Sequence, residues 1–266
     1  MTSSSLPTTE QAPADTRRPD VSFVMPCYNE EEVLEYTIPK LMQAFTAAGY
    51  RLELVAVDNG SKDGTGDVIA SLKARYAGIV PTRVQVNQGY GNGVLHGIPL
   101  CTAPWIGFIP ADGQVDAEDV VRLYEAAAAT RGKVLAKVRR RFRMDGLLRK
   151  LVSTSYNVFV RLLWPGLASI DVNGSPKLLP ADVVRAMDLQ SKDWLLDPEV
   201  MVKAHQMGLR VLEFNVFARM RGAGLSHVRA STCWEFFHRL LIFRLTSHWR
   251  TSDAVGQVAL EERARS

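Results

Sequence analysis

The chain has 266 residues, of which 47% are hydrophobic and 23% charged, and its formal net charge is +4. This composition is typical of a globular protein and excludes a fibrous, disulfide-stapled or wholly disordered chain. Three cysteines at positions 27, 101 and 233 form no paired framework, so we expect a reduced, cytoplasmic setting. The mild positive charge is compatible with nucleic acid, an anionic membrane surface or a phosphorylated substrate.

The ends of the chain differ in composition from its centre. Residues 1–19 are rich in Ser, Thr, Pro and Ala, which predicts a disordered N-terminal tail without a secretory signal. Residues 20–228 predict one globular domain, and residues 229–266 an amphipathic helical segment followed by a polar tail. No stretch approaches the ~18 apolar residues of a membrane-spanning helix.

Strands and helices are predicted to alternate over residues 21–130. Short apolar runs predict strands at 21–25, 52–58, 83–86 and 105–111. Amphipathic stretches predict helices over 30–50, from 65 to 77, up to Leu100, and from Asp116 to about Thr130. For the first helix, Asn29 and Glu32 have capping-box spacing, and Pro39 predicts a kink or an early break. This alternation indicates an α/β fold with a Rossmann-like, doubly wound, mostly parallel sheet.

The second half of the chain has a less regular pattern. It predicts a strand at 133–138, a helix through 155–164 and a last strand at 209–216. Asp197 followed by Pro198 predicts a helix start with Asp197 as its cap. The aromatic and apolar segment 233–245, with interleaved basic residues, fits either a core helix or a helix in a membrane interface.

Polar segments follow the first four predicted strands. They are the segments PCYNE (26–30), DNGSKDGT (58–65), NQGYGNG (87–93) and ADGQ (111–114). In a parallel sheet, ligands bind at the carboxyl ends of the strands, where glycines admit a ligand to the backbone and acids or amides bind it. Any one segment could be an ordinary turn. Four at one sheet edge favour a nucleotide site.

The same segments carry a family resemblance. Residues 26–30, 57–65 and 87–91 resemble the opening motifs of glycosyltransferase family 2, most closely its dolichol-phosphate mannose synthase and polyprenyl-phosphate glycosyltransferase branch. The resemblance covers about residues 21–228 and implies a single-domain A-type glycosyltransferase fold with a GDP- or UDP-hexose donor. It also implies that the donor is bound by Pro26, Tyr28, Glu30, Asp58, Asn59, Asn87, Gly89 and Asp112.

The metal motif departs from the family pattern. Residues 110–114 read Pro-Ala-Asp-Gly-Gln, where this branch usually has Asp-Ala-Asp-x-Gln. Asp112 and Gln114 are therefore the predicted ligands of Mg²⁺ or Mn²⁺, and Asp112 is also predicted to be catalytic. Because Pro110 replaces one acid, we expect weaker metal affinity than at a two-acid site. Asp116 is a further candidate ligand or simply a helix cap.

A basic run lies at residues 133–150, with eight Lys and Arg residues and the single acid Asp145. Aromatic residues are not interleaved apart from Phe142, and no recognition motif is present, so we expect no nucleic-acid partner. Fixed cations instead suit a reaction in which two phosphate-bearing substrates meet. The resemblance implies that arginines here hold the donor and acceptor phosphates, and the matching candidates are Arg139, Arg149 and, in a later motif, Arg221.

The acceptor decides whether a catalytic base is required. A phosphate monoester is already anionic near neutral pH, whereas a sugar hydroxyl must lose a proton to a carboxylate. Glu199 matches a family position that can host such a base. The basic run favours an inverting transfer, by one in-line displacement, to a polyprenyl phosphate at the cytoplasmic membrane face, met by a peripheral protein. A soluble hydroxyl or glycan acceptor, and a non-catalytic nucleotide-sugar-binding protein, are the alternatives.

Overall fold

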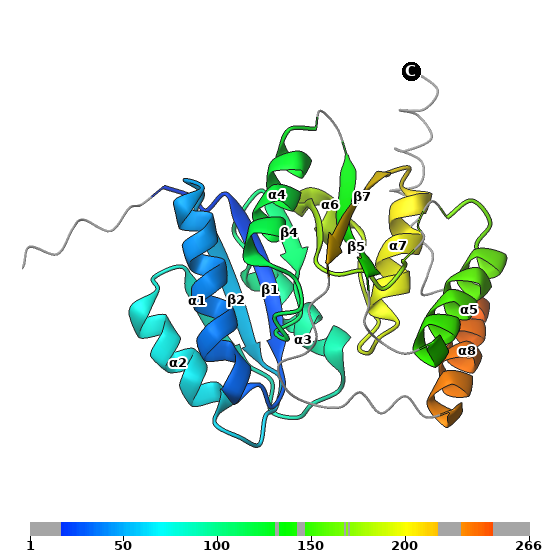
Figure 1. Ribbon diagram of the computed structural model, residues 1–266, viewed down its shortest axis with the longest axis horizontal. Helices are drawn as coiled ribbons and strands as arrows, with labels where there is room; N and C mark the ends of the chain where they lie inside the picture. The colour runs from blue at the N-terminus through cyan, green and yellow to red at the C-terminus, as the bar shows by residue number, and fades with distance from the viewer. Residues whose placement is uncertain are drawn as a thin grey trace, which may run out of the picture.

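The computed structural model describes residues 17–130, 133–142, 147–167, 169, 171–217 and 230–246, and every statement below concerns these residues. They form one α/β domain in which a seven-stranded sheet lies between helices (Figure 1). The sheet order is β3-β2-β1-β4-β6-β5-β7. All neighbouring pairs are parallel except those that β6 makes with β4 and β5. The predicted mostly parallel α/β sheet is confirmed.

The strands are β1 (Val21–Cys27), β2 (Leu52–Asp58), β3 (Ile79–Arg83), β4 (Trp105–Phe108), β5 (Val134–Phe142), β6 (Lys177–Pro180) and β7 (Arg210–Phe217). The helices are α1 (Glu31–Ala47), α2 (Thr65–Arg75), α3 (Tyr90–Gly97), α4 (Ala117–Ala128), α5 (Leu147–Leu163), α6 (Ala181–Ala186), α7 (Leu196–Gln206) and α8 (Ala230–Leu245), with a short 3₁₀ helix (Ile98–Leu100) after α3. The sheet separates two apolar clusters because successive strand side chains point to opposite faces. Phe23 packs with α1, α2 and α4, whereas its neighbour Val24 packs with α3 and the helices of the second half.

Strand β3 begins earlier than the sequence pattern predicts. The predicted strand at 83–86 is wrong except for Arg83, and Val86 is 67% exposed. Pro81 lies inside the observed strand, which is tolerated because β3 is at the edge of the sheet and pairs only with β2. Strand β6 and helix α6 were not predicted, because both are short and β6 begins with a buried lysine.

Helix α1 differs from its prediction at its start, and it continues through Pro39. The capping-box prediction is wrong: Asn29 has a φ of 54°, Glu30 is the N-cap, and the Glu30 side chain makes no capping hydrogen bond. The Asn29 side chain instead accepts a hydrogen bond from the Lys62 backbone N–H at 3.0 Å. Nor does the helix break at Pro39, which is buried in its interior. Apolar packing of the helix onto the sheet outweighs the one hydrogen bond that proline cannot donate.

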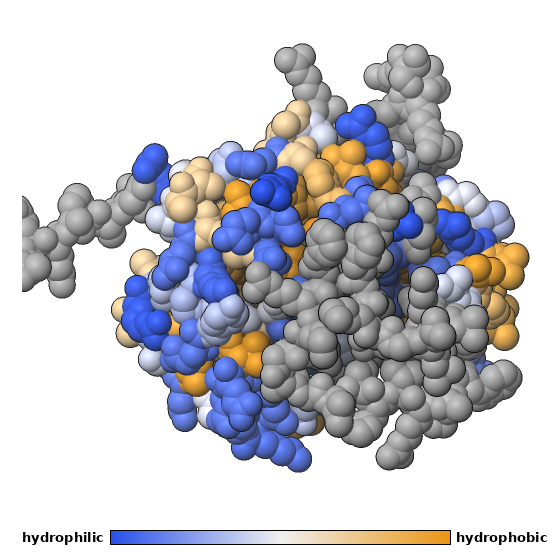
Figure 2. Space-filling view, in the orientation of Figure 1, coloured by the Kyte–Doolittle hydropathy of each residue, from blue (hydrophilic) through white to orange (hydrophobic). Residues whose placement is uncertain are grey.

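Helices α5 and α8 lie side by side at one end of the molecule (Figure 1). The Trp164 and Phe243 rings, 6.0 Å apart, and a 3.1 Å hydrogen bond from Arg244 Nε to the Leu163 carbonyl oxygen join this region. Figure 2 shows hydrophobic surface at this end. The large apolar side chains exposed on the two helices are Val158, Leu162, Leu241, Ile242 and Leu245. Within the described ranges, no helix is long and apolar enough to cross a bilayer.

Candidate active site

The polar loops after the first strands meet at one edge of the sheet. The register of β1, β2 and β3 places Cys27 beside Asp58, and Asp58 beside Arg83. Strand β4 is the other neighbour of β1, and Ile109, just after it, donates a backbone hydrogen bond of 3.0 Å to Val24. Parallel pairing therefore brings the Asp58 loop and the Asp112 loop to the same edge, as expected from their places in the sequence.

Asp58 is held rigidly where β2 ends. Its carboxylate is almost buried, accepts a 2.9 Å hydrogen bond from the Ser61 backbone N–H, and lies 3.4 Å from Arg83 Nε. Burial raises the pKa of the neighbouring Cys27 thiol, and the charges of Glu30 and Asp58 raise it further. Cys27 is therefore a protonated, structural side chain and no nucleophile.

Asn59 links two of the predicted donor-binding segments. Its backbone N–H donates to the Cys27 carbonyl at 2.8 Å, and its side-chain Nδ2 donates to the Gly89 carbonyl at 3.0 Å. The Gly89 N–H in turn donates to Asn87 Oδ1 at 2.7 Å. The structure thus brings Asn59, Asn87 and Gly89 together through direct contacts. Tyr28, at the start of the preceding loop, is 42% exposed.

Pro26 and Glu30 occupy different parts of the same edge. Pro26 is buried, and a Cβ atom at Gly93 of α3 would approach its Cβ to 2.9 Å. Glu30 is half-buried, and its backbone N–H donates to Thr65 Oγ1 at 2.9 Å. These contacts fasten the first predicted loop to α3 and to the start of α2.

A pocket opens beside Asp112. Gln114, Asp116, Ser175 and Pro176 line it, and α1 contributes Tyr36, Thr37 and Lys40 to the lining. Asp112 Oδ1 accepts a 3.2 Å hydrogen bond from the Gln114 backbone N–H. Asp116 stands at the N-cap of α4, but its side chain makes no capping hydrogen bond.

The donor atoms around this pocket fit a hard divalent cation. They are the carboxylate oxygens of Asp112 and Asp116 and the carboxamide oxygen of Gln114. The described part of the chain contains no cluster of three or more His, Cys, Asp or Glu residues that could hold a metal. Mg²⁺ commonly uses only one or two protein carboxylates and completes its shell with phosphate oxygens and water. The residues therefore fit a cation that binds together with a phosphate-bearing ligand.

Tyr90 is a site residue whose surroundings the sequence did not reveal. Burial raises the pKa of its phenol, the charge of Asp197 adds to this, Ser175 opposes it, and Asp112 contributes a smaller increase. These interactions put the Tyr90 side chain near both carboxylates. Its ring stacks on Trp194, with centroids 5.2 Å apart and planes 5° apart.

Asp197 does not cap α7, so that prediction is wrong. The helix begins at Leu196 after the N-cap Leu195, and the Asp197 carboxylate forms an ion pair with Lys177. The Lys177 side chain is fully buried on β6. A buried ammonium requires a carboxylate partner, which explains the placement.

Glu199 lies two residues further along α7, in the interior. Its carboxylate is fully buried and accepts hydrogen bonds from the Ser191 N–H at 2.8 Å and from the Gln190 N–H at 3.0 Å. Lys203 Nζ lies 2.7 Å away. The predicted general base therefore has no exposed surface from which to meet an acceptor hydroxyl.

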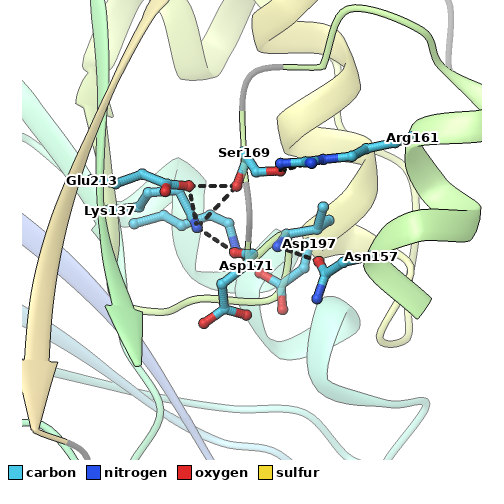
Figure 3. A network of polar contacts seen from close by, with 9 residues as sticks. Lys137, Asn157, Arg161, Ser169, Asp171, Asp197 and Glu213 are labelled. Carbon is cyan, nitrogen blue, oxygen red and sulfur yellow. Dashed lines mark hydrogen bonds and ion pairs between the residues drawn. The ribbon is translucent and has the colours of Figure 1, made fainter. Parts of the chain in front are cut away.

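A third buried lysine, Lys137, is the centre of a polar network (Figure 3). Its Nζ donates to Ser169 Oγ and to Glu213 Oε1, both at 3.3 Å, and to the Asp171 carbonyl oxygen. Burial, and then the charge of Lys177 on the adjacent strand, lower the pKa of Lys137 to about 8. The network connects β5 and β7 with the loop that leads to β6.

The predicted phosphate-binding arginines are placed only in part. Arg139 lies on β5 two residues after Lys137, so the two side chains share a face of the sheet, and Arg139 is half-buried. The backbone of Arg149 belongs to α5, and its side chain lies outside the described residues. Arg221 lies wholly outside them. Their roles stay predictions.

Comparisons with known proteins agree with this architecture. The model of "Glycosyl transferase family 2" matches residues 22–184. An uncharacterized glycosyltransferase of Mycobacterium tuberculosis is 32% identical over 228 residues, covering 79% of this chain and 90% of that one. An undecaprenyl-phosphate 4-deoxy-4-formamido-L-arabinose transferase of Pectobacterium carotovorum is 31% identical over 145 residues, covering 53% of this chain and 43% of that one.

Among solved structures, the chain is similar to glucosyl-3-phosphoglycerate synthase of Mycobacterium tuberculosis in complex with Mn²⁺, UDP and glucosyl-3-phosphoglycerate. The TM-score is 0.64 at 17% identity, covering 88% of this chain and 81% of that one. At this identity the likeness concerns the fold. The predicted A-type glycosyltransferase fold and the resemblance drawn from the sequence motifs are confirmed.

Proposed function

The chain belongs to glycosyltransferase family 2, and from this premise we propose that it transfers a hexose from UDP or GDP to a polyprenyl phosphate. One observation carries the proposal: the Asp112 pocket lies just after β4, at the same sheet edge as the Asp58–Asn59 turn, and a basic strand, β5, lies in the same sheet. A relative named for an undecaprenyl-phosphate acceptor supports the acceptor class.

In the proposed mechanism, the Asp58–Asn59 turn and the Asn87–Gly89 segment bind the nucleotide, because their hydrogen bonds already hold them in place. Asp112 and Gln114 would hold Mg²⁺ or Mn²⁺, which would offset the charge of the leaving diphosphate. Arg139, with Arg149 and Arg221, would neutralise the acceptor phosphate as it approaches.

A phosphate oxygen would attack the anomeric carbon from the side opposite the diphosphate, so the configuration would invert in a single displacement. The attacking group is an anion near neutral pH and needs no general base. This fits the environment of Glu199, whose carboxylate is enclosed by backbone N–H groups and Lys203.

A soluble phosphate-bearing acceptor is the second candidate. The structurally similar synthase was solved with phosphoglyceric acid, which also carries a phosphate group. The same arginines would suit the phosphate group of either acceptor, so a turnover assay has to distinguish the two.

A turnover assay with the full chain tests both candidates. UDP- and GDP-hexoses are supplied with Mn²⁺ and either a short polyprenyl phosphate or a soluble phosphorylated acceptor. We expect a labelled product that extracts into organic solvent and disappears with EDTA. Asp112→Ala should lower turnover by about a hundred- to a thousandfold while leaving the unfolding transition unchanged. A water-soluble product alone would replace the lipid acceptor with the second candidate.

The proposal includes contact with the surface of a membrane. Exposed apolar side chains on the packed pair α5 and α8, seen at one end of the molecule in Figure 2, support it. Such a surface binds the boundary between headgroups and acyl chains. Cosedimentation with anionic phospholipid vesicles is the expected result, and recovery of all the protein in the supernatant would contradict it.

A further inference from the structure

Residues 188–195, called here the 188–195 loop, pack backbone against backbone on the start of α3. The Asn92 N–H donates to the Lys192 carbonyl at 2.7 Å. Gly89 has a φ of +114°, and a Cβ atom there would lie 2.7 Å from the same oxygen. A Cβ atom at Gly91 would lie 2.2 Å from another carbonyl oxygen of the loop. Glycine at these two positions therefore permits the contact.

Side chains add to this contact. The Trp194 and Tyr90 rings stack in parallel, and Trp194 remains 54% exposed. Lys192 Nζ donates to Gln88 Oε1 at 3.1 Å. The loop thus touches the predicted nucleotide-binding segment on consecutive residues from 88 to 92.

Glu199 and Lys203 fasten the loop from the interior. The Glu199 carboxylate accepts from the N–H groups of Gln190 and Ser191, at 3.0 and 2.8 Å. Lys203, 2.7 Å from Glu199, also donates to the Asp188 carbonyl at 2.7 Å. Charge-assisted hydrogen bonds of this kind are among the strongest that proteins make.

On its other side, Gly89 contacts the proposed donor site. Its carbonyl accepts from Asn59 and its N–H donates to Asn87. Gly89 therefore lies between the 188–195 loop on one side and the side chains of Asn59 and Asn87 on the other.

We propose that Glu199 is a positioning residue for donor binding: it orders the 188–195 loop, which holds the Asn59–Asn87–Gly89 arrangement in its nucleotide-binding geometry. This rests on the proposed location of the donor site, and it gives Glu199 a role other than that of a catalytic base. The role is confined to binding and is independent of the acceptor.

The test is Glu199→Gln in the full chain, titrated with UDP and with GDP in the presence of Mn²⁺. An amide cannot replace a carboxylate that accepts from two N–H groups and an ammonium. We expect nucleotide Kd and donor KM to rise about tenfold, kcat to change by less than about twofold, and its pH profile to keep its shape. Backbone hydrogen exchange should become faster in residues 87–92 and 188–195.

A matched control is Glu53→Gln. Glu53 is a nearly buried carboxylate that accepts from the Thr102 N–H at 2.8 Å and from Ser22 Oγ at 2.9 Å, at the opposite end of β2 from Asp58. The Glu53→Gln variant should be less stable than the wild type but should bind nucleotide with the same affinity. If E199Q weakens binding no more than E53Q does, the proposal is overturned.

A second variant keeps the test decisive if E199Q fails to fold. Trp194 is half exposed, so the Trp194→Ala variant should fold. This variant lacks the ring that stacks on Tyr90, and we expect its nucleotide Kd to rise about threefold. Trp194→Phe should restore the wild-type Kd. Wild-type affinity in W194A would overturn the proposal. So would an E199Q enzyme with unchanged nucleotide Kd, a collapsed kcat and a lost ionisation in its pH profile. Nucleotide titration needs no acceptor, so a wrong acceptor assignment would leave this result intact.

Discussion

The two halves of the sheet are built on different principles. Around β1, β2 and their helices, the described interior is apolar, and buried polar groups lie toward strand ends and in turns. Around β5, β6 and α7, the interior holds the fully or almost fully buried lysines 137, 177 and 203, each with an acidic partner. The first half positions its ligand-binding groups through backbone turns. In the second half, each buried lysine is paired with an acidic side chain that offsets its charge.

The largest expected difference between the halves concerns the Lys177–Asp197 pair. Lys177→Met leaves the Asp197 carboxylate almost buried and unpaired, so we expect the free energy of unfolding to fall by about 3–5 kcal/mol. Adding Asp197→Leu should restore most of that loss, because a buried ion pair can be replaced by apolar side chains. Urea denaturation measures both variants.

An apolar deletion in the first half provides the control. Leu34→Ala should cost about 2–5 kcal/mol, and no substitution at Asp197 should recover it. A Lys177→Met chain as stable as the wild type would remove the contrast between the halves.

A smaller effect is expected from the titration of Lys137. Its pKa is about 8 in the folded protein, against 10.5 ordinarily, so between these values the unfolded chain binds more protons. The free energy of unfolding should therefore rise with pH from about 8 to 10.5, by about 3 kcal/mol. Lys137→Met should abolish this rise relative to the wild type, as measured by urea denaturation at each pH. Parallel curves for the two proteins would contradict the assignment.

The smallest effect should come from an ion pair of the first half. Arg83 lies 3.4 Å from Asp58, but its side chain is 58% exposed. Arg83→Gln should therefore change the free energy of unfolding by less than about 1 kcal/mol. Thermal unfolding of the two proteins measures the difference. A loss as large as that of Lys177→Met would show that the first half also depends on charge pairing.

The same contrast explains what the sequence could predict. In the first half, alternating apolar runs and polar turns gave the order of strands and helices and the meeting of Asn59, Asn87 and Gly89. Residue preferences for strands predicted β3 too late in the sequence. A strand that contains Pro81 is acceptable only at the edge of a sheet, and the tertiary structure decides which strand is at the edge.

In the second half, buried charges interrupted the apolar pattern on which prediction relies. No strand was predicted at β6, which is short and begins with Lys177, and Asp197 was predicted to be a helix cap because its partner is 20 residues away in the sequence. Glu199 matched a family position, but its burial against Gln190 and Ser191 depends on how a loop folds back. Such long-range pairings leave no local signature.

The paired lysines also bear on how this fold can diverge. Loss of Lys177 or Lys203 alone leaves a buried or almost buried acid without its ammonium partner, and loss of Lys137 leaves the half-buried Glu213 without one. We therefore expect positions 177 and 197, 137 and 213, and 199 and 203 to change together among descendants of a common ancestor. If each pair is replaced only as a pair, the second half of the sheet tolerates fewer single substitutions than the first.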